Sequence, residues 1–490
     1  MADRQDGILD TGVVAWDEKG ETRSKAHSFS KWAIEILRPA ILTRGGPRIQ
    51  TTRRATAYLD GLRGFAAFLV YWHHHQLWPR TTYASMGADF FLESAYGYKD
   101  KYFFAAMPIV RTFFTGGHFA VSIFFIISGY VLSAKPLYLI HAGEQVKLGD
   151  NLASALFRRW IRLFLPVIGT TFLYIVSWHL LGIWTVSPEH KANFRDEMWN
   201  FYKEFKAFSF VFRTGGNGFF SYNFPTWSIP VEFKGSIIIY TCLLAFSRAT
   251  KNARLLLQVG LIIYFMWIVD GWFGSLFVLG MLLCELDLLA RSNELPFCIK
   301  VFEPYKTPIF YTLFVIGMFL SGVPSHTREY ADLLEAPYWR HVAFLVPQAA
   351  WDYKWFYLFF ASLFVITSIP RISWLKAFFE IRFNQYLGRI SFALYLIHGP
   401  VLWTLADRLY VATGWYREAH EINTPFLINA FPLSKKGPLG LEPSFLIPHI
   451  IILPVTLWVA EVVTKLFDEP AVQFAQWLYQ QTLAPNEQRK

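Results

Sequence analysis

The chain has 490 residues, of which 54% are hydrophobic and only 17% are charged, against a charged fraction of about 25% in typical soluble domains. This composition excludes an ordinary soluble protein and favours a membrane protein. The net charge of +10 does not indicate a nucleic-acid partner, because the basic residues lie between apolar runs, and the three cysteines lack the paired spacing of a disulfide framework or a zinc site.

Apolar runs recur from residue 58 onward. A bilayer core about 30 Å thick requires roughly 20 apolar residues per helix. The sequence therefore predicts an all-α integral membrane domain over residues 58–470, between a flexible basic tail (1–57) and a C-terminal tail (471–490). Within the first tail, Lys31–Thr43 could form an interfacial helix interrupted by Pro39, but a solvated tail is the favoured interpretation. About ten spans are expected: Tyr58–Trp78, Thr112–Ala134, Leu163–Trp184, Trp227–Ser247, Leu255–Val269, Gly271–Leu289, Thr307–Val323, Trp355–Ile369, Tyr386–Ala406 and Pro443–Val463.

The fifth and sixth runs are split only by Asp270 and Gly271, so they could also form one long tilted helix. The distribution of basic residues favours two helices. With ten spans and a cytosolic N-terminus, 28 of the 46 Lys and Arg residues lie on the cytosolic side and 16 on the other. This excess obeys the positive-inside rule. We therefore expect both termini in the cytosol.

The first run carries polar residues that a bilayer disfavours, at about 2.5 to 3.5 kcal/mol for each charge. Asp60 and Arg63 lie three residues apart and can neutralise each other. Arg63 and His74 lie eleven residues apart, which places them on one helix face with a rise of about 16 Å. Imidazole accepts protons near neutral pH, so His74 is a candidate general base. The alternative is that residues 73–75 form a histidine and aromatic belt at the outer interface.

A histidine-box iron centre is not favoured, because it needs several histidine clusters. Outside the triplet at 73–75, the sequence has isolated histidines such as His118, His179, His398 and His449. We therefore predict no metal ligands.

The third run opens with a group of arginines, Arg158, Arg159 and Arg162, which we expect at the cytosolic mouth of the bundle. Guanidinium forks match phosphate oxygens. Alone, the group would be ordinary positive-inside anchoring. Together with Arg63 it predicts a basic funnel for an anionic ligand that enters from the cytosol.

The fourth run starts on the outer side with Trp227 and Ser228, which places Glu232 about 7 Å inside. That depth matches His74, so the two side chains could pair. The alternative is that Glu232 forms an ion pair with Lys234 or another internal base and only holds helices together.

The ninth run carries Ser391, Tyr395 and His398, spaced by four and three residues, as one polar stripe. A hydrogen-bond network between helices would explain the same stripe. The second run contains Phe124–Tyr130, whose Ser-Gly pair favours close helix packing.

These segments, in this order, resemble the acyltransferase 3 family of multi-pass membrane proteins. The matching pieces are Leu59–Gly64 with His74, Phe124–Tyr130, Arg158–Arg162, Thr226–Glu232, Gly388–His398 and Asp468–Pro470. The resemblance implies that the chain is a ten-helix acyltransferase, which uses cytosolic acyl-CoA, often acetyl-CoA, to acylate hydroxyl groups. It also implies that His74 is catalytic, that Arg63 is the characteristic first-helix arginine, and that Arg158, Arg159 and Arg162 bind CoA. The triplet at 73–75 is a departure, so the choice of His74 rests on spacing.

We therefore expect an acyl-CoA-dependent O-acyltransferase with no permanently bound cofactor. Glu232 would orient the imidazolium, and Tyr395 or Ser228 would donate to the oxyanion. The length and aromatic richness are most similar to fungal members associated with natural products, so the expected acceptor is a terpenoid or polyketide alcohol. A carbohydrate O-acetyltransferase and a proton-coupled transporter are the alternatives. The expected location is an endomembrane, such as the endoplasmic reticulum, or the plasma membrane.

Overall fold

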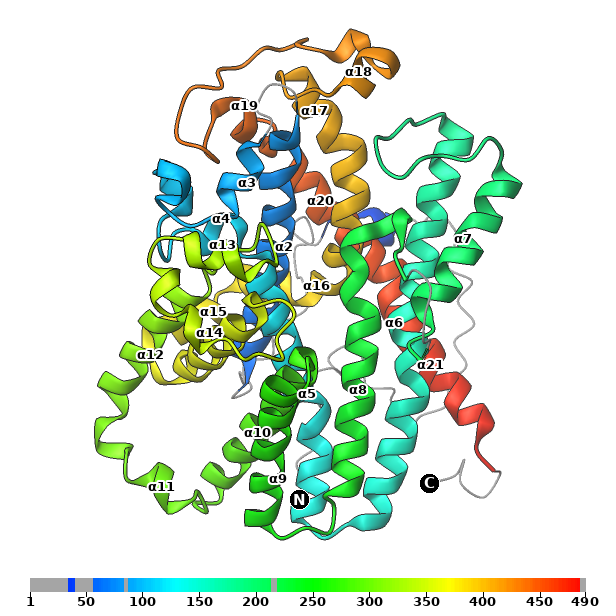
Figure 1. The fold of residues 1–490 in the computed structure, drawn as a ribbon. Helices are drawn as coiled ribbons and strands as arrows, with labels where there is room; N and C mark the ends of the chain where they lie inside the picture. Colours follow the sequence, from blue (N-terminus) through cyan, green and yellow to red (C-terminus); the bar gives the residue numbers. More distant parts are fainter. Residues whose placement is uncertain (1–33, 40–55, 83–86, 213–217, 485–490) are drawn as a thin grey trace.

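The computed structural model describes residues 34–39, 56–82, 87–212 and 218–484. These described residues form helices and loops, with no strand among them. A helix lies at each of the ten predicted runs, and Figure 1 shows them gathered into one bundle. They are α2 (Ala57–Leu77), α5 (Gly117–His141), α6 (Gln145–Leu181), α8 (Ser228–Ala245), α9 (Lys251–Ile263), α10 (Trp272–Arg291), α12 (Lys306–Leu320), α14 (Lys354–Ser368), α16 (Arg382–Val401) and α20 (His449–Val463).

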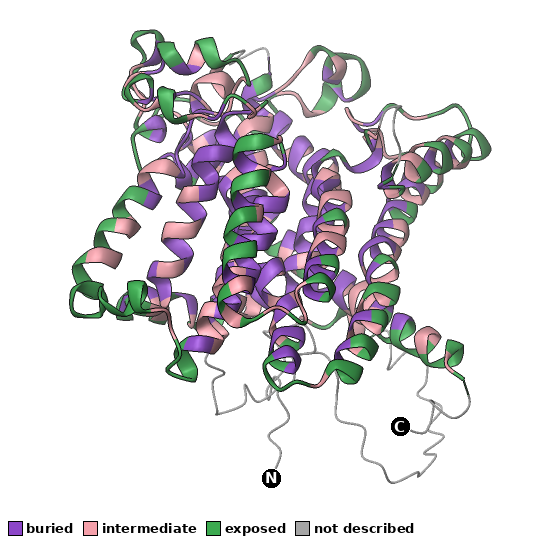
Figure 2. Ribbon diagram, turned by 60° about the horizontal axis from the view of Figure 1, so that its bottom comes forward, coloured by how far each residue is buried: buried purple, intermediate pink, exposed green. Residues whose placement is uncertain are grey.

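Six helical segments of the described chain are long and apolar enough to cross a membrane, and a bent pair, α14 with α15 (Ser373–Phe379), would make a seventh. Large apolar side chains are exposed on the outer faces of α9, α12 and α20, as expected for helices in contact with lipid. Buried residues face the centre of the bundle (Figure 2). The chain is thus a multi-pass membrane protein, while ten spans and cytosolic termini stay predictions.

The fifth and sixth predicted runs are two helices. After α9 ends, a π-helical turn (Tyr264–Ile268) leads to Val269, which has an extended backbone, and α10 then starts at Trp272. The two helices pack against each other. One long tilted helix is therefore excluded.

Helix α6 begins 18 residues earlier than the predicted run, at Gln145 instead of Leu163, and extends over 37 residues. Its first turns mix polar residues with Leu and Ala, which favour helix regardless of burial. The arginines at 158, 159 and 162 therefore lie well inside a long helix. Their predicted position at the cytosolic mouth of the bundle stays a prediction.

Both predicted tails are partly ordered. Most of Lys31–Thr43 lies outside the described residues, but within the described part Trp458 Nε1 donates a hydrogen bond to the Leu37 carbonyl at 2.8 Å. The predicted C-terminal tail is helical as far as residue 482, because α21 (Glu469–Thr482) buries Ala471 and Ala475 and packs on α6. The predicted cytosolic C-terminal segment is thus largely helical, and its location in the cytosol stays a prediction.

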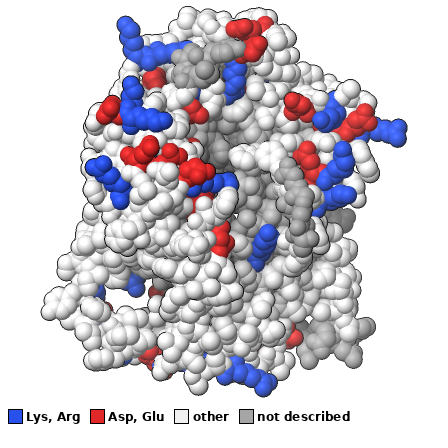
Figure 3. All heavy atoms as spheres, in the orientation of Figure 1, with Lys and Arg blue, Asp and Glu red and all other residues white. Residues whose placement is uncertain are grey.

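The segments that connect the ten bundle helices, including several shorter helices, lie at the two ends of the bundle. The helices α7 (Phe194–Ser209), α17 (Asp407–Ala412), α18 (Glu418–Asn423) and α19 (Pro443–Leu446) lie toward the top of Figure 1, whereas α11 (Phe297–Lys300) lies at the opposite end. Charged side chains gather over the upper part of the face in Figure 3, and much of its lower half is uncharged. This arrangement fits a bundle with an apolar belt.

Helices α2 and α16 cross at backbone contact because both carry glycine there. A Cβ atom on Gly64 would lie 2.2 Å from the Gly388 nitrogen, and one on Gly388 would lie 2.4 Å from the Asp60 carbonyl oxygen. No real Cβ tolerates either contact. The close crossing fixes the register of the two helices, and it positions the polar residues that follow on each.

A Gly64→Ala variant should therefore lose thermal stability, since the added methyl group forces the backbones apart at about 1 to 3 kcal/mol. Gly149→Ala is the matched control, because a Cβ there meets no atom within 4 Å. The check is the midpoint of thermal unfolding of both variants in detergent. Equal midpoints for Gly64→Ala and the unmodified chain would contradict the role of the crossing.

Candidate functional site

A cavity of about 350 Å³ lies where the end of α2, the start of α5 and the turn before α8 meet. Histidines contribute a large share of its polar lining, with Glu93 and Lys354. The complete lining is Val70, His73, His74, Leu77, Glu93, Gly117, His118, Val121, Phe224, Pro225, Trp227, Ser325, His326, Thr327, Arg328, Lys354 and Tyr395.

The three consecutive histidines of α2 point in three directions, because successive residues of a helix differ by about 100°. The ring of His74 lies 5.0 Å from that of His398 on α16. His73 turns toward the start of α5, and His75 Nδ1 lies 2.8 Å from the hydroxyl of Tyr410. All three rings pack inside the protein, so the alternative of a histidine belt facing lipid is wrong.

The hydrogen bonds of His74 and His398 fix their tautomers. His74 Nδ1 lies 2.9 Å from the Val70 carbonyl, and His398 Nδ1 lies 2.7 Å from the Tyr395 carbonyl. A carbonyl only accepts, so each Nδ1 carries the proton and each Nε2 keeps a free lone pair. The buried His398 Nε2 has no hydrogen-bond partner among the described residues. The pair is thus set up to receive a proton.

The hydroxyls of Tyr395 on α16 and Ser228 on α8 are hydrogen-bonded to each other, and we call this pair the Tyr395–Ser228 wall. Tyr395 donates its hydrogen bond to the Pro225 carbonyl, and the Ser228 hydroxyl lies 2.7 Å from the Tyr395 oxygen. Since a phenol has one proton, Ser228 is the donor of the second bond. Both protons are therefore in use, and neither group reaches an oxyanion without rearrangement.

One end of the α2–α16 contact is built around Arg63. Arg63 Nη2 donates to the Gly388 carbonyl at 2.9 Å and lies 3.5 Å from Asp60, which confirms the predicted neutralisation. The Ser391 hydroxyl donates to the same carbonyl at 2.9 Å. Arg63 and His74 both face α16, as their spacing predicts. The polar stripe of α16 thus divides, with Ser391 beside Arg63 and His398 beside His74.

Glu232 pairs with Arg159 of α6, whose Nε also donates to Ser236 at 2.7 Å. The predicted pairing of Glu232 with His74 is wrong, and the alternative of an ion pair with an internal base is correct. The physical reason is the early start of α6, which carries Arg159 to the depth of Glu232. Ser128 of α5 lies beside Glu232, a proximity that the packing interpretation of Phe124–Tyr130 did not include.

The remaining arginines lie in the same region. Arg158 is half-buried and donates through Nε to the Ser154 carbonyl at 3.1 Å. Arg162 interacts electrostatically with Glu232 and Asp468. We call Arg63, Arg158, Arg159 and Arg162 the arginine cluster. None of the four lines the cavity. Along α8, Glu232, which pairs with Arg159, is about 6 Å further than Ser228.

Comparison with known proteins supports an acyltransferase. The chain is 28% identical to O-acetyltransferase PaAT-1 of Phomopsis amygdali, over 93% of this chain and 90% of that protein. It is 21% identical to Acyltransferase clz18 of Cochliobolus lunatus and to Acyltransferase R4 of a Phoma species, each over 76% of this chain and 88% of the relative. No solved structure matches it.

The family model for the acyltransferase domain of the acyltransferase 3 family matches residues 56–434. The matched segment contains α2, α5, α6, α8 and α16, and with them both the cavity and the arginine cluster. The resemblance noted in the sequence is confirmed, and the chain belongs to the acyltransferase 3 family.

Proposed function

We propose that this protein transfers an acetyl group from acetyl-CoA to a hydroxyl group of a lipophilic small molecule of the terpenoid or polyketide type. The observation that carries the proposal is the His74–His398 pair, which lies beside a cavity of ligand size at one end of α2 while Arg63 lies near the other. The similarity to a protein named as an O-acetyltransferase supports the acetyl group.

In this proposal the arginine cluster binds the phosphates of CoA, since guanidinium forks match phosphate oxygens. The rise of about 16 Å from Arg63 to His74 is comparable to the extended pantetheine arm. The Tyr395–Ser228 wall must then open to admit the thioester. Its opening would also release the two hydroxyl protons for the oxyanion.

The chemical step begins when His74 Nε2 takes the proton of the acceptor hydroxyl. The hydroxyl oxygen attacks the thioester carbon, the new C–O bond forms, the C–S bond breaks, and the thiolate of CoA takes the proton from His74. The ring of His398 lies 5.0 Å from that of His74 and would hold the His74 ring in place. The proposal gives this supporting role to His398, because Glu232 is paired with Arg159.

The cavity lining combines apolar and polar side chains. Val70, Leu77, Val121 and Phe224 line it together with Trp227, and His73, Glu93, His118, Ser325 and Lys354 line it as well. The apolar side chains suit a lipophilic acceptor, and the polar ones, which could bond sugar hydroxyl groups, leave a carbohydrate as the alternative acceptor. The direct test is to incubate membranes that contain the protein with labelled acetyl-CoA and a panel of terpenoid and polyketide alcohols. The expected product carries one acetyl ester, and a panel of sugars should remain unmodified.

Removing Arg158 and Arg162 together should weaken acetyl-CoA binding by at least tenfold, because two charge-assisted phosphate contacts are lost, each worth about 1.5 to 3 kcal/mol. The measurement is the equilibrium binding of labelled acetyl-CoA to the purified protein in detergent. The matched control is the double variant Arg248→Ala with Arg382→Ala, which removes the same charge from two exposed positions. Equal affinity of both double variants would contradict the assignment of the donor site.

A further inference from the structure

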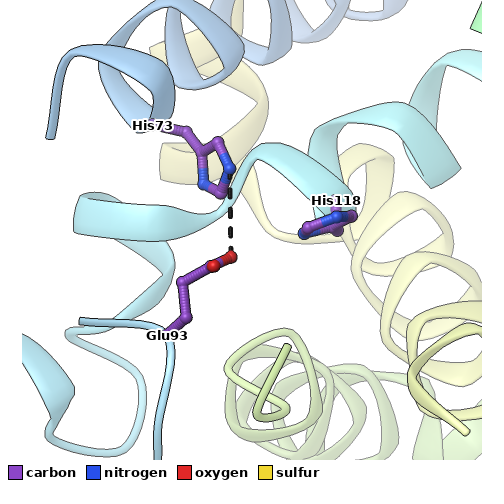
Figure 4. Close-up of side chains that lie close together, drawn as sticks. All are labelled: His73, Glu93 and His118. Carbon is purple, nitrogen blue, oxygen red and sulfur yellow. Dashed lines mark ion pairs between the residues drawn. The ribbon is translucent and has the colours of Figure 1, made fainter. Parts of the chain in front are cut away.

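A second group of side chains, of types that can bind a metal ion, lies in the cavity beside the His74–His398 pair. Figure 4 shows His73 of α2, His118 of α5 and Glu93, which follows α3 (Ala88–Leu92), pointing toward one another. One donor atom from each lies within 4.8 Å of the other two, and His73 Nε2 is 4.0 Å from Glu93 Oε1. The mechanism proposed above does not use any of the three.

We propose that His73, Glu93 and His118 bind one divalent transition-metal ion of the Zn²⁺ class. Two imidazoles and one carboxylate are a donor set of catalytic zinc sites, which keep a fourth position open. Donors at about 2.1 Å from a tetrahedral ion lie roughly 3.4 Å apart. The donor atoms lie within 4.8 Å of one another, so side-chain rotations that shorten the longest separation by up to about 1.4 Å would bring all three donors onto one ion.

The ring nitrogens support this assignment. His73 Nδ1 and His118 Nδ1 are both buried, and neither has a hydrogen-bond partner among the described residues. A buried polar atom without a partner is costly, at about 1 to 3 kcal/mol. A metal bond to one nitrogen of each ring would offset the cost of these unpaired atoms.

Glu93 is held in place by a second layer of contacts, as metal-binding carboxylates usually are. The Ser325 hydroxyl donates to Glu93 Oε1 at 2.9 Å, and the Ser325 nitrogen donates to the Glu93 carbonyl at 2.9 Å. Arg111 Nη2 donates to the same carbonyl at 3.1 Å. The carboxylate therefore faces the two imidazoles from a fixed backbone.

Three cations lie near the group, and one of them, Arg328, lines the cavity and lies 3.7 Å from Asp352. Lys354 forms a buried ion pair with Asp352. Burial lowers the pKa of Arg111 to about 10, so it stays charged at neutral pH, but its donors are bound by the carbonyls of Leu92, Val323 and Glu93 and by Ser325.

The ion would lie beside the catalytic histidine, since the rings of His73 and His74 are 5.1 Å apart. Its open position faces the cavity that all three donors line. An oxygen of a bound small molecule or a water molecule would occupy that position. The proposed metal site does not include any residue of the arginine cluster, to which the proposed function assigns acetyl-CoA.

The test measures metal content directly. The full chain is purified in detergent with a tag that lacks histidine, stripped with a chelator, dialysed against Zn²⁺ and analysed by elemental mass spectrometry. The expected result is about one ion per chain. Glu93→Gln and His118→Asn should lower the affinity for Zn²⁺ at least tenfold, whereas Glu329→Gln and His341→Asn, at exposed positions, should bind as the unmodified chain does. Full binding by either site variant would overturn the proposal.

A second measurement needs no variant and so does not depend on variant folding. Co²⁺ added to the stripped, unmodified chain should give the visible absorption of a four-coordinate site with nitrogen and oxygen ligands, and Zn²⁺ should abolish it by displacement. If the unmodified chain retains no ion and shows no such spectrum, His73 and Glu93 form only an ion pair and the proposal fails. Acetyl transfer is not a readout in either experiment, so the outcome is separate from that of the proposed function.

Discussion

Replacement of His74 by Ala should lower the rate of acetyl transfer by about 10²- to 10⁴-fold, the usual loss when a general base is removed. Within the His74–His398 pair, only His74 lines the cavity. His398 therefore cannot replace it in taking the proton from the acceptor. The measurement is single-turnover transfer from labelled acetyl-CoA in membranes.

The His74→Ala variant should still bind acetyl-CoA, because the arginine cluster is unchanged. His341→Ala is the matched control, since that histidine is exposed and lies outside the cavity lining. His398→Asn should show a smaller loss of rate, because it removes only the partner of the imidazolium. A His74→Ala variant that binds the donor and transfers acetyl groups at the normal rate would refute the assignment.

Replacement of Glu232 by Leu alone should destabilise the protein by roughly 3 to 5 kcal/mol, because it leaves the charge of Arg159 buried without its partner. Arg159 is 6% exposed and its side chain is held between Glu232 and Ser236. Replacing both residues, as Arg159→Met with Glu232→Leu, should recover much of the loss, since apolar pairs often substitute for buried ion pairs.

The midpoint of thermal unfolding in detergent measures this effect for the two single variants and the double variant. Lys251→Ala provides the control, because its ion pair with Glu294 is exposed and such pairs contribute about 0 to 1 kcal/mol. If Glu232→Leu unfolds at the same temperature as the unmodified protein, the ion pair does not hold α6 to α8.

The positions of the ten helices could be predicted from the sequence, because the length and hydropathy of an apolar run are local properties. The separation of α9 from α10 followed from charge counting. The start of α6 could not be predicted in the same way, because its first turns are polar and helical at once. Hydropathy identifies the part of a helix that suits lipid and does not identify where the helix begins.

The site could be predicted in part. The spacing of Arg63 and His74 placed both on one face, and the structure shows that face against α16. The partner of Glu232 could not be predicted, because it depends on how far α6 extends past α8. Glu93 carried no signal, since it lies in a loop and meets His73 and His118 only through tertiary packing.

The sequence by itself determined the class of protein, the approximate positions of the ten helices and the face of α2 that carries Arg63 and His74, because each of these depends on residues within a few turns of one another. Only the tertiary structure decided which side chains meet. The crossing of α2 and α16 at Gly64 and Gly388 sets the distance from His74 to His398, and contacts between residues hundreds of positions apart depend on such packing.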